Sequence, residues 1–146
     1  MTNQIRVFLH GRKFKRLSDR AYEMLRNQYE VKQIEIEILY YLSQKSEASS
    51  SEICRELDLN KGQVSTAMEN LRKRGFVTAK QDLSDRRYMY FSMTKLGGPV
   101  IQAAEQIKTR VESQIFAGFS EEDFQKLDYL TERIFNNMDE IDPALP

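Results

Sequence analysis

Apolar residues near the N-terminus recur at helical spacing with basic residues between them: Ile5, Leu9, Leu17, Ala21 and Leu25. This spacing predicts one long amphipathic helix from about Gln4 to Gln28, which Gly11 weakens modestly. The next stretch, Ile34 to Ile38, alternates apolar and polar residues like a strand. We favour a helix there, because Val31, Ile34, Ile38, Leu39 and Leu42 also share one helical face and no hairpin partner with turn chemistry is near.

The middle of the chain predicts two short helices joined by a tight turn. A polar connector, Ser46 to Ser51, precedes a helix that Ser49 or Ser50 can cap. After a turn at Asp58-Leu59, Asn60 is a good N-cap for a second helix and Gln63 stands at its N3 position. That helix carries a buried stripe and ends at Gly75 after two basic residues; the stripe is Val64, Ala67, Met68 and Leu71.

Two strands should follow, Phe76 to Lys80 and Tyr88 to Ser92, joined by the polar loop Asp82 to Asp85. A further long helix is expected from Thr94 to about Phe116. Pro99 either sits at N1 of a helix that starts after Gly98 or marks a kink.

The last helix is capped by Ser120, with Asp123 at N3 and Phe119 and Phe124 at the staple positions. Its apolar face comprises Phe124, Leu127, Leu130, Ile134 and Met138.

The fold class is therefore mainly α with a small β-hairpin wing, that is, a winged helix-turn-helix flanked by N- and C-terminal helices. We expect residues 31–97 to form the DNA-binding domain, and residues 1–30 and 98–146 to form a helical dimerisation region. The terminal apolar stripes lack an obvious cover within one chain, so we expect a second subunit. The alternative is that the long helices bury one another.

Charge supports this division although the formal net charge is zero. Residues 61–87 contain seven basic and three acidic residues, a net charge of +4, and residues 1–20 carry +5. Residues 98–146 carry −6. Because local charge steers a polyanion, the positive segments suit nucleic acid, although solvated faces would give the same composition.

Composition excludes several other classes. No apolar run approaches the roughly 18 residues of a membrane helix, and the first residues lack the apolar core of a signal peptide. A lone cysteine, Cys54, fits a reducing cytoplasm. With one histidine and no phosphate-binding glycine loop, we expect no metal, no cofactor and no enzyme activity.

The second helix and the wing resemble the MarR family of bacterial transcriptional regulators. The pattern includes Lys61-Gly62-x-Val64-Ser65, Leu71, Gly75, Val77, Asp82-x-x-Asp85-Arg86-Arg87 and Thr94-x-x-Gly97. The resemblance implies a homodimer whose terminal helices interleave and whose winged helices reach a palindromic operator on double-stranded DNA. It also implies that a small aromatic effector can release the DNA, or that a cysteine senses oxidants.

The chain departs from the family pattern at two places. Ser84 stands where family wings often have a third arginine. The family's sensing cysteine usually lies near the N-terminus, whereas Cys54 is in the first helix of the helix-turn-helix, where a small buried residue is common. A buried thiol in apolar surroundings is unreactive, which favours a structural Cys54.

Groove geometry assigns the candidate DNA contacts. Gln63 suits adenine, Lys61 suits guanine or phosphate, and Ser65 and Thr66 suit either a base edge or a phosphate. Asn70 and Lys73, further along, suit the backbone. An arginine at the wing, Arg86 or Arg87, suits a narrow minor groove. We expect Asp85 to orient a neighbouring arginine, and one of the two arginines to point inward and pair with an acid, so that only one touches DNA.

The function predicted is a dimeric, sequence-specific DNA-binding transcriptional regulator, a repressor released by a small aromatic ligand. The alternatives are a redox-sensing regulator acting through Cys54 and a module that docks protein instead of DNA. Several aromatic residues can line an effector pocket, although aromatics at helical spacing also form plain core: Phe8, Tyr22, Tyr29, Tyr40 and Tyr41.

Overall fold

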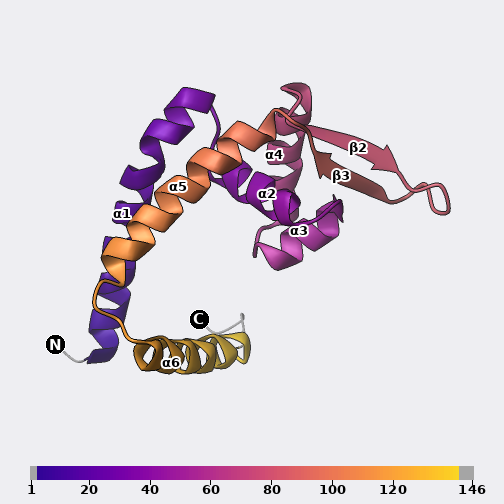
Figure 1. The fold of residues 1–146 in the computed structure, drawn as a ribbon. Coiled ribbons are helices and arrows are strands. Elements are labelled where there is room, and N and C mark those ends of the chain that lie inside the picture. The colour runs from indigo at the N-terminus through magenta and orange to yellow at the C-terminus, as the bar shows by residue number, and fades with distance from the viewer. Residues whose placement is uncertain (1–2, 142–146) are drawn as a thin grey trace. The chain divides into compact units, whose positions relative to one another are not determined.

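The structure, a computed structural model, describes residues 3–141, with the side chains of residue 6 and residues 9–141 (Figure 1). The chain divides into two compact units, one up to Arg110 and one from Val111, and each is described by itself. In chain order the elements are α1 (Asn3–Tyr29), α2 (Gln33–Gln44), β1 (Ala48–Ser49), α3 (Ser50–Glu56), α4 (Lys61–Lys73), β2 (Val77–Gln81), β3 (Met89–Met93), α5 (Gly97–Ile115) and α6 (Glu121–Asp139).

The core of the first unit lies where α2, α3 and α4 pack on one another and on the sheet. α2 is a helix, as the apolar face containing Ile38 and Leu42 predicted, and the strand-like alternation around Glu35 is not a strand. The predicted stripe of α4 is entirely buried, and Val100 and Ala104 of α5 join the same core. Burial of such a stripe is the main stabilisation of a short amphipathic helix.

The sheet of this unit is antiparallel with the strand order β1-β3-β2. The hairpin β2–β3 pairs Val77 with Met93 and Gln81 with Met89, so each strand lies one residue later than the sequence indicated. β1 pairs Ala48 with Phe91 and was missed, because it occupies the segment that the sequence presented as a polar connector. A strand of two residues is too short to show an alternating pattern.

The start of α5 differs from the sequence prediction. The helix begins at Gly97 instead of Thr94, because the Thr94 hydroxyl donates to the Gly75 carbonyl (2.6 Å) and the Thr94 N–H donates to the Phe76 carbonyl (2.8 Å). Pro99 therefore lies in the first turn, where a missing N–H is tolerated. A Cβ atom at position 97 would stand 2.5 Å from the Met93 side chain, so any larger residue there would force that side chain to move.

The helix caps follow the sequence closely. Ser49 caps α3, Asn60 caps α4 and Ser120 caps α6, each by accepting a hydrogen bond from the N–H of the third helical residue. In the second unit the Phe119 and Phe124 rings lie 5.4 Å apart, as a hydrophobic staple requires.

One carboxylate is buried in the core. Glu35, 1% exposed, accepts hydrogen bonds from the Lys32 N–H (3.0 Å) and from the Asn70 amide (2.6 Å). It therefore caps α2 and ties α2 to α4 at once. The sequence alone does not indicate this role, because Asn70 lies 35 residues from Glu35.

We expect Glu35→Ala to lower the free energy of unfolding by about 2–4 kcal/mol, because the α2 cap and the half-buried Asn70 amide would lose their acceptor. Glu35→Gln should lower it by about 1 kcal/mol, because the Asn70 amide can turn and accept from the new amide. Urea denaturation at one protein concentration measures both changes. Glu37→Ala, on the exposed side of α2, is the matched control and should shift the unfolding free energy by less than about 0.5 kcal/mol. Equal effects at positions 35 and 37 would contradict the role of Glu35.

Candidate DNA interface

The first turn of α4 is fixed by a complete capping box. The Gln63 N–H donates to the Asn60 side-chain oxygen (2.8 Å), and the Asn60 N–H donates to Gln63 Oε1 (3.0 Å). The capping box thereby sets the start of α4 at Lys61. The backbone N–H groups of the first turn point away from the body of the helix. The Gln63 side chain is held against the cap by its oxygen, which leaves its NH₂ group outside the capping box.

The opposite side of α4 from the core is exposed and polar. Five of the residues predicted to contact DNA lie on it: Lys61, Gln63, Ser65, Thr66 and Lys73. Asn70 is different, because it is half-buried and its amide donates to Glu35. The structure thus gives Asn70 an intramolecular partner in place of the phosphate that the sequence suggested.

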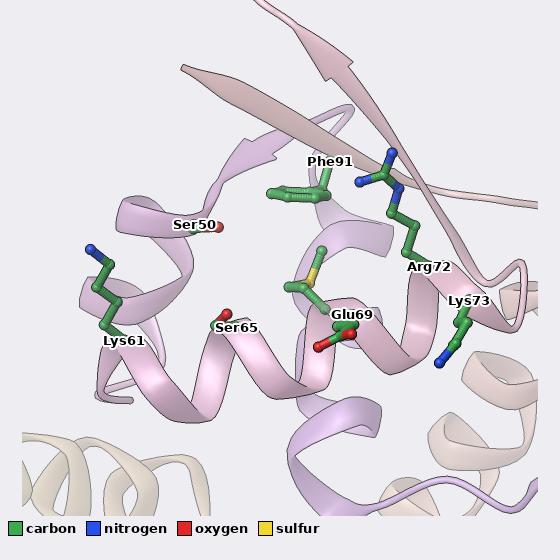
Figure 2. Close-up of a pocket in the computed structure, with 8 residues that line it drawn as sticks. Ser50, Lys61, Ser65, Glu69, Arg72, Lys73 and Phe91 are labelled. Carbon is green, nitrogen blue, oxygen red and sulfur yellow. The ribbon is translucent and has the colours of Figure 1, made fainter. Parts of the chain in front are cut away.

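A hollow of about 680 Å³ runs along one side of α4, between this helix and β3 (Figure 2). Figure 2 shows Lys61 near the start of α4, and Arg72 and Lys73 towards its end. The floor is formed by Met68 and Phe91. The full lining is Ser50, Lys61, Ser65, Met68, Glu69, Arg72, Lys73 and Phe91.

Three polar residues of this hollow were missed by the sequence analysis. Glu69 and Arg72 follow Ser65 at intervals of four and seven residues, so helical periodicity could have placed them on the same side. Ser50 belongs to α3 and reaches the hollow only through the packing of α3 on α4. No spacing in the sequence indicates such a contact.

A second groove of about 560 Å³ follows the other side of α4 and includes Gln63 and Thr66. Lys32 and Gln33, at the start of α2, line it as well. The exposed part of α4 is therefore a ridge between two grooves. A ridge of this kind is the shape that a major groove accepts.

The wing carries two local hydrogen-bonded turns. Asp82 accepts from the N–H (2.8 Å) and the hydroxyl (2.7 Å) of Ser84, and these bonds lower the pKa of Asp82. Ser84, which stands where the family often has arginine, therefore closes the loop through Asp82. Leu83 between them is 95% exposed.

The second turn pairs Asp85 with Arg87. Arg87 Nε donates to Asp85 Oδ1 (3.0 Å) and Arg87 Nη2 donates to Oδ2 (2.8 Å), a bidentate pair. Hydrogen bonds from Arg87 lower the pKa of Asp85, so the pair stays formed at neutral pH and is lost only on acidification. Asp85 thus pairs with a neighbouring arginine, as predicted, but the paired arginine does not point inward as expected, because the Arg87 side chain remains 84% exposed. The Arg86 side chain is exposed too, and its carbonyl accepts from Gln81.

A separate small pocket of about 220 Å³ lies in the first unit, lined mainly by α1, α2 and α5. Tyr22 and Tyr40 line it, and the Lys108 ammonium stands 3.3 Å from the Tyr40 hydroxyl and 5.3 Å from the centre of its ring. Tyr29 and Tyr41 pack against the core instead, and the side chain of Phe8 lies outside the described residues. The remaining lining is Gln33, Ile36, Glu37, Leu57 and Ala104.

Cys54 packs against the core, but it is half-buried and not fully buried as the sequence suggested. Among residues 3–141 no cluster of three or more histidine, cysteine, aspartate or glutamate side chains is placed to hold a metal ion. The helices in the same part of the chain include none with the length and apolar content to cross a membrane.

Comparison with known proteins identifies the domain and the fold. Residues 31–97 match the model of the winged helix DNA-binding domain. No curated protein matches the chain in sequence.

Solved structures match nearly the whole chain. The Staphylococcus aureus MepR–DNA complex superposes with a TM-score of 0.78 at 19% identity, over 94% of this chain and 98% of MepR. A MarR protein from Peptoclostridium difficile gives 0.77 at 22% identity, over 94% and 88% of the two chains. FabT of Streptococcus pneumoniae, solved in complex with DNA, gives 0.75 at 18% identity, over 95% and 98%.

These findings confirm the predicted fold class and the resemblance to MarR-family proteins. The segment from Lys61 to Arg87, in which the motifs were found, lies inside the matched domain. Residues 31–97 thus form a winged helix DNA-binding domain, and the fold of the chain is similar to that of MepR and of the MarR protein.

Proposed function

We propose that this protein is a dimeric, sequence-specific transcriptional repressor that binds a palindromic operator and is released by a small aromatic ligand. The observation that carries the proposal is the exposed polar ridge of α4, flanked by a hollow with three basic side chains and followed by a wing with an oriented arginine. The solved complexes of MepR and FabT with DNA support double-stranded DNA as the partner.

In this proposal α4 enters the major groove. Gln63, Ser65 and Thr66 lie on its first two turns and read base edges, whereas Lys61 and Lys73 neutralise phosphates. The capping box holds Gln63 near the helix start, and its NH₂ group can donate to adenine N7 while its oxygen accepts a second hydrogen bond. We leave Asn70 out of the proposed contacts, because its amide is engaged by Glu35.

The wing arginine that we propose for the minor groove is Arg87. Asp85 holds its guanidinium in one orientation while leaving it 84% exposed, so little side-chain entropy is lost on binding. In this arrangement Arg86 contacts the phosphate backbone of the DNA.

The proposal of a dimer rests on apolar faces that the single chain leaves exposed. α6 buries none of its residues, and Leu130 and Ile134 are 53% and 49% exposed. Leu17 of α1 is 45% exposed as well. Apolar faces of this extent on helices mark protein interfaces. A two-fold dimer would place two copies of α4 on a palindrome whose half-sites lie about one helical turn apart.

The proposal of ligand release rests on the pocket between Tyr22, Tyr40 and Lys108. A volume of about 220 Å³ suits a single aromatic ring. Tyr40 offers a ring to stack on and Lys108 a positive charge for a phenolate or carboxylate. Because α1, α2 and α5 all contribute to its lining, a ligand there can shift the dimer relative to α4.

The proposed role of Asp85 can be tested, because the two possible roles predict opposite changes in operator affinity for Asp85→Asn. If Asp85 acted on DNA only by its charge, Asp85→Asn would tighten binding. Because we propose that Asp85 orients Arg87, we expect Asp85→Asn to weaken operator binding about as much as Arg87→Ala, by roughly 1–2 kcal/mol. Titration of labelled operator by fluorescence anisotropy at two salt concentrations measures this, and Arg87→Ala should lower the salt slope by about 1 per subunit if it also meets phosphate.

Gln63→Glu is the comparison in the same titrations. It retains the capping oxygen but loses the amide donor and adds a negative charge. The charge should weaken binding to both duplexes by about two- to fivefold, and loss of the base contact should weaken binding to the operator by roughly a further 1–3 kcal/mol. Equal loss on both duplexes would show that Gln63 makes no base contact. Tighter binding by Asp85→Asn would refute the orienting role.

The dimer should be lost when charge enters the apolar face of α6. We expect Ile134→Asp to convert the protein to monomer at micromolar concentration and to weaken operator binding more than tenfold, because each half-site then binds alone. Sedimentation equilibrium gives the mass. Glu132→Gln, on the same helix, is the control. A dimer that survives Ile134→Asp and truncation after Ser120 would place the interface elsewhere.

Ligand release is tested with a panel of phenols and aromatic carboxylates. An active compound should lower operator affinity at a concentration that also changes tyrosine fluorescence, and Tyr40→Ala should raise that concentration at least tenfold while leaving DNA affinity without ligand unchanged. Compounds that act equally on the wild type and on Tyr40→Ala would exclude this pocket as the effector site.

A further inference from the structure

We propose that Glu69 is a specificity-determining residue. Its carboxylate would accept a hydrogen bond from the exocyclic amino group of cytosine (N4) or adenine (N6) in the major groove. This inference rests on the proposed function, in which α4 enters that groove, and it adds a named base chemistry to it.

The position of Glu69 places it among the proposed contacts. It lies one turn after Ser65 and one turn before Lys73, with an exposed side chain. Figure 2 shows its carboxylate on the side of α4 that borders the hollow, between Ser65 and the two basic residues at the end of the helix. A residue here meets the same groove as Ser65.

Glu69 is also unpaired within residues 3–141, where no hydrogen bond or ion pair engages it. This is unexpected from its spacing, because Lys73 stands four residues later, the favourable arrangement for a helical ion pair. Elsewhere the chain does form such pairs, between Lys15 and Asp19 at 2.9 Å and between Glu122 and Lys126 at 2.7 Å. The carboxylate of Glu69 therefore remains available to an external donor.

A free carboxylate on a DNA-facing helix opposes binding unless a donor meets it. Phosphates repel it, and so do the acceptors that guanine (O6, N7) and thymine (O4) present in the major groove. Only cytosine and adenine present an amino group there. Glu69 thus discriminates twice, by attraction to an amino group and by repulsion from bases that lack one.

This assignment predicts effects of opposite sign on two kinds of DNA. Glu69→Ala should tighten binding to random duplex by about two- to fivefold, because one negative charge leaves the vicinity of the phosphates. The same variant should weaken binding to the operator by about tenfold or more, because a base contact is lost. A residue that is merely part of the helix surface would give the first effect without the second.

The experiment begins with selection of operator sequences from a random duplex pool by the full-length protein. The wild-type consensus should contain, in each half-site, a position restricted to cytosine or adenine that Glu69→Ala relaxes. Glu69→Gln should keep that position but favour adenine, because an amide donates to N7 as well as accepting from N6. Glu23→Ala removes the same charge from an exposed position on α1, away from the hollow, and should change neither the consensus nor the affinity for random duplex.

A double-mutant cycle then identifies the contact. The selected base is replaced by its analogue without the amino group, pyrimidin-2-one for cytosine or purine for adenine. The analogue should weaken wild-type binding about tenfold or more and leave the binding of Glu69→Ala nearly unchanged.

Additive effects of the analogue and the variant would overturn the proposal, as would an unchanged consensus for Glu69→Ala. If the wild type itself enriches no sequence, the proposed sequence-specific function fails and the Glu69 assignment fails with it. If the wild type enriches a palindrome that Glu69→Ala retains in full, only the Glu69 assignment fails.

Discussion

The placement of α4 depends on two polar ties near its C-terminus, beside an otherwise apolar contact. Glu35, buried in the first turn of α2, accepts from the Lys32 N–H and the Asn70 amide and so links the start of α2 to the last turn of α4. At the C-cap of α4, the Arg74 guanidinium donates to the carbonyls of Tyr29 and Glu30 and lies 5.1 Å from the centre of the Phe76 ring. Apolar packing alone would tolerate a small rotation of α4, whereas directional hydrogen bonds do not.

The hydrogen bonds of Arg74 connect α4 to the end of α1. The carbonyls held by Arg74 belong to the last residue of α1 and to Glu30, whose φ of 52° turns the chain sharply into α2. Any displacement of α1 would therefore reach the C-terminus of α4 through a hydrogen-bonded contact. This is the physical basis on which the proposed ligand pocket, which also contacts α1, can influence DNA binding.

The exposed charges of the domain are arranged by local hydrogen bonds. On the wing, both acidic side chains accept hydrogen bonds. Asp82 accepts from Ser84 and shapes the loop, and Asp85 accepts from Arg87 and orients its guanidinium. On α4, Glu69 has no such partner among the described residues. Acidic residues within one basic segment thus have different physical roles, and the net charge of the segment does not distinguish them.

The sequence by itself determined the features that depend on neighbouring residues. Helical periodicity located the buried stripe of α4, and short-range side-chain chemistry located the caps at Ser49, Asn60 and Ser120, because each cap bonds within its own turn. The strand ends and the start of α5 differ from the positions that the sequence predicted. The start of α5 differs because the Thr94 hydroxyl is held by the distant Gly75 carbonyl. Only the tertiary structure decided that Asn70 serves Glu35, thirty-five residues away, and that Ser50 joins Glu69 and Arg72 in one hollow. Contacts of that kind are set by how helices pack, and no periodicity in a single segment encodes them.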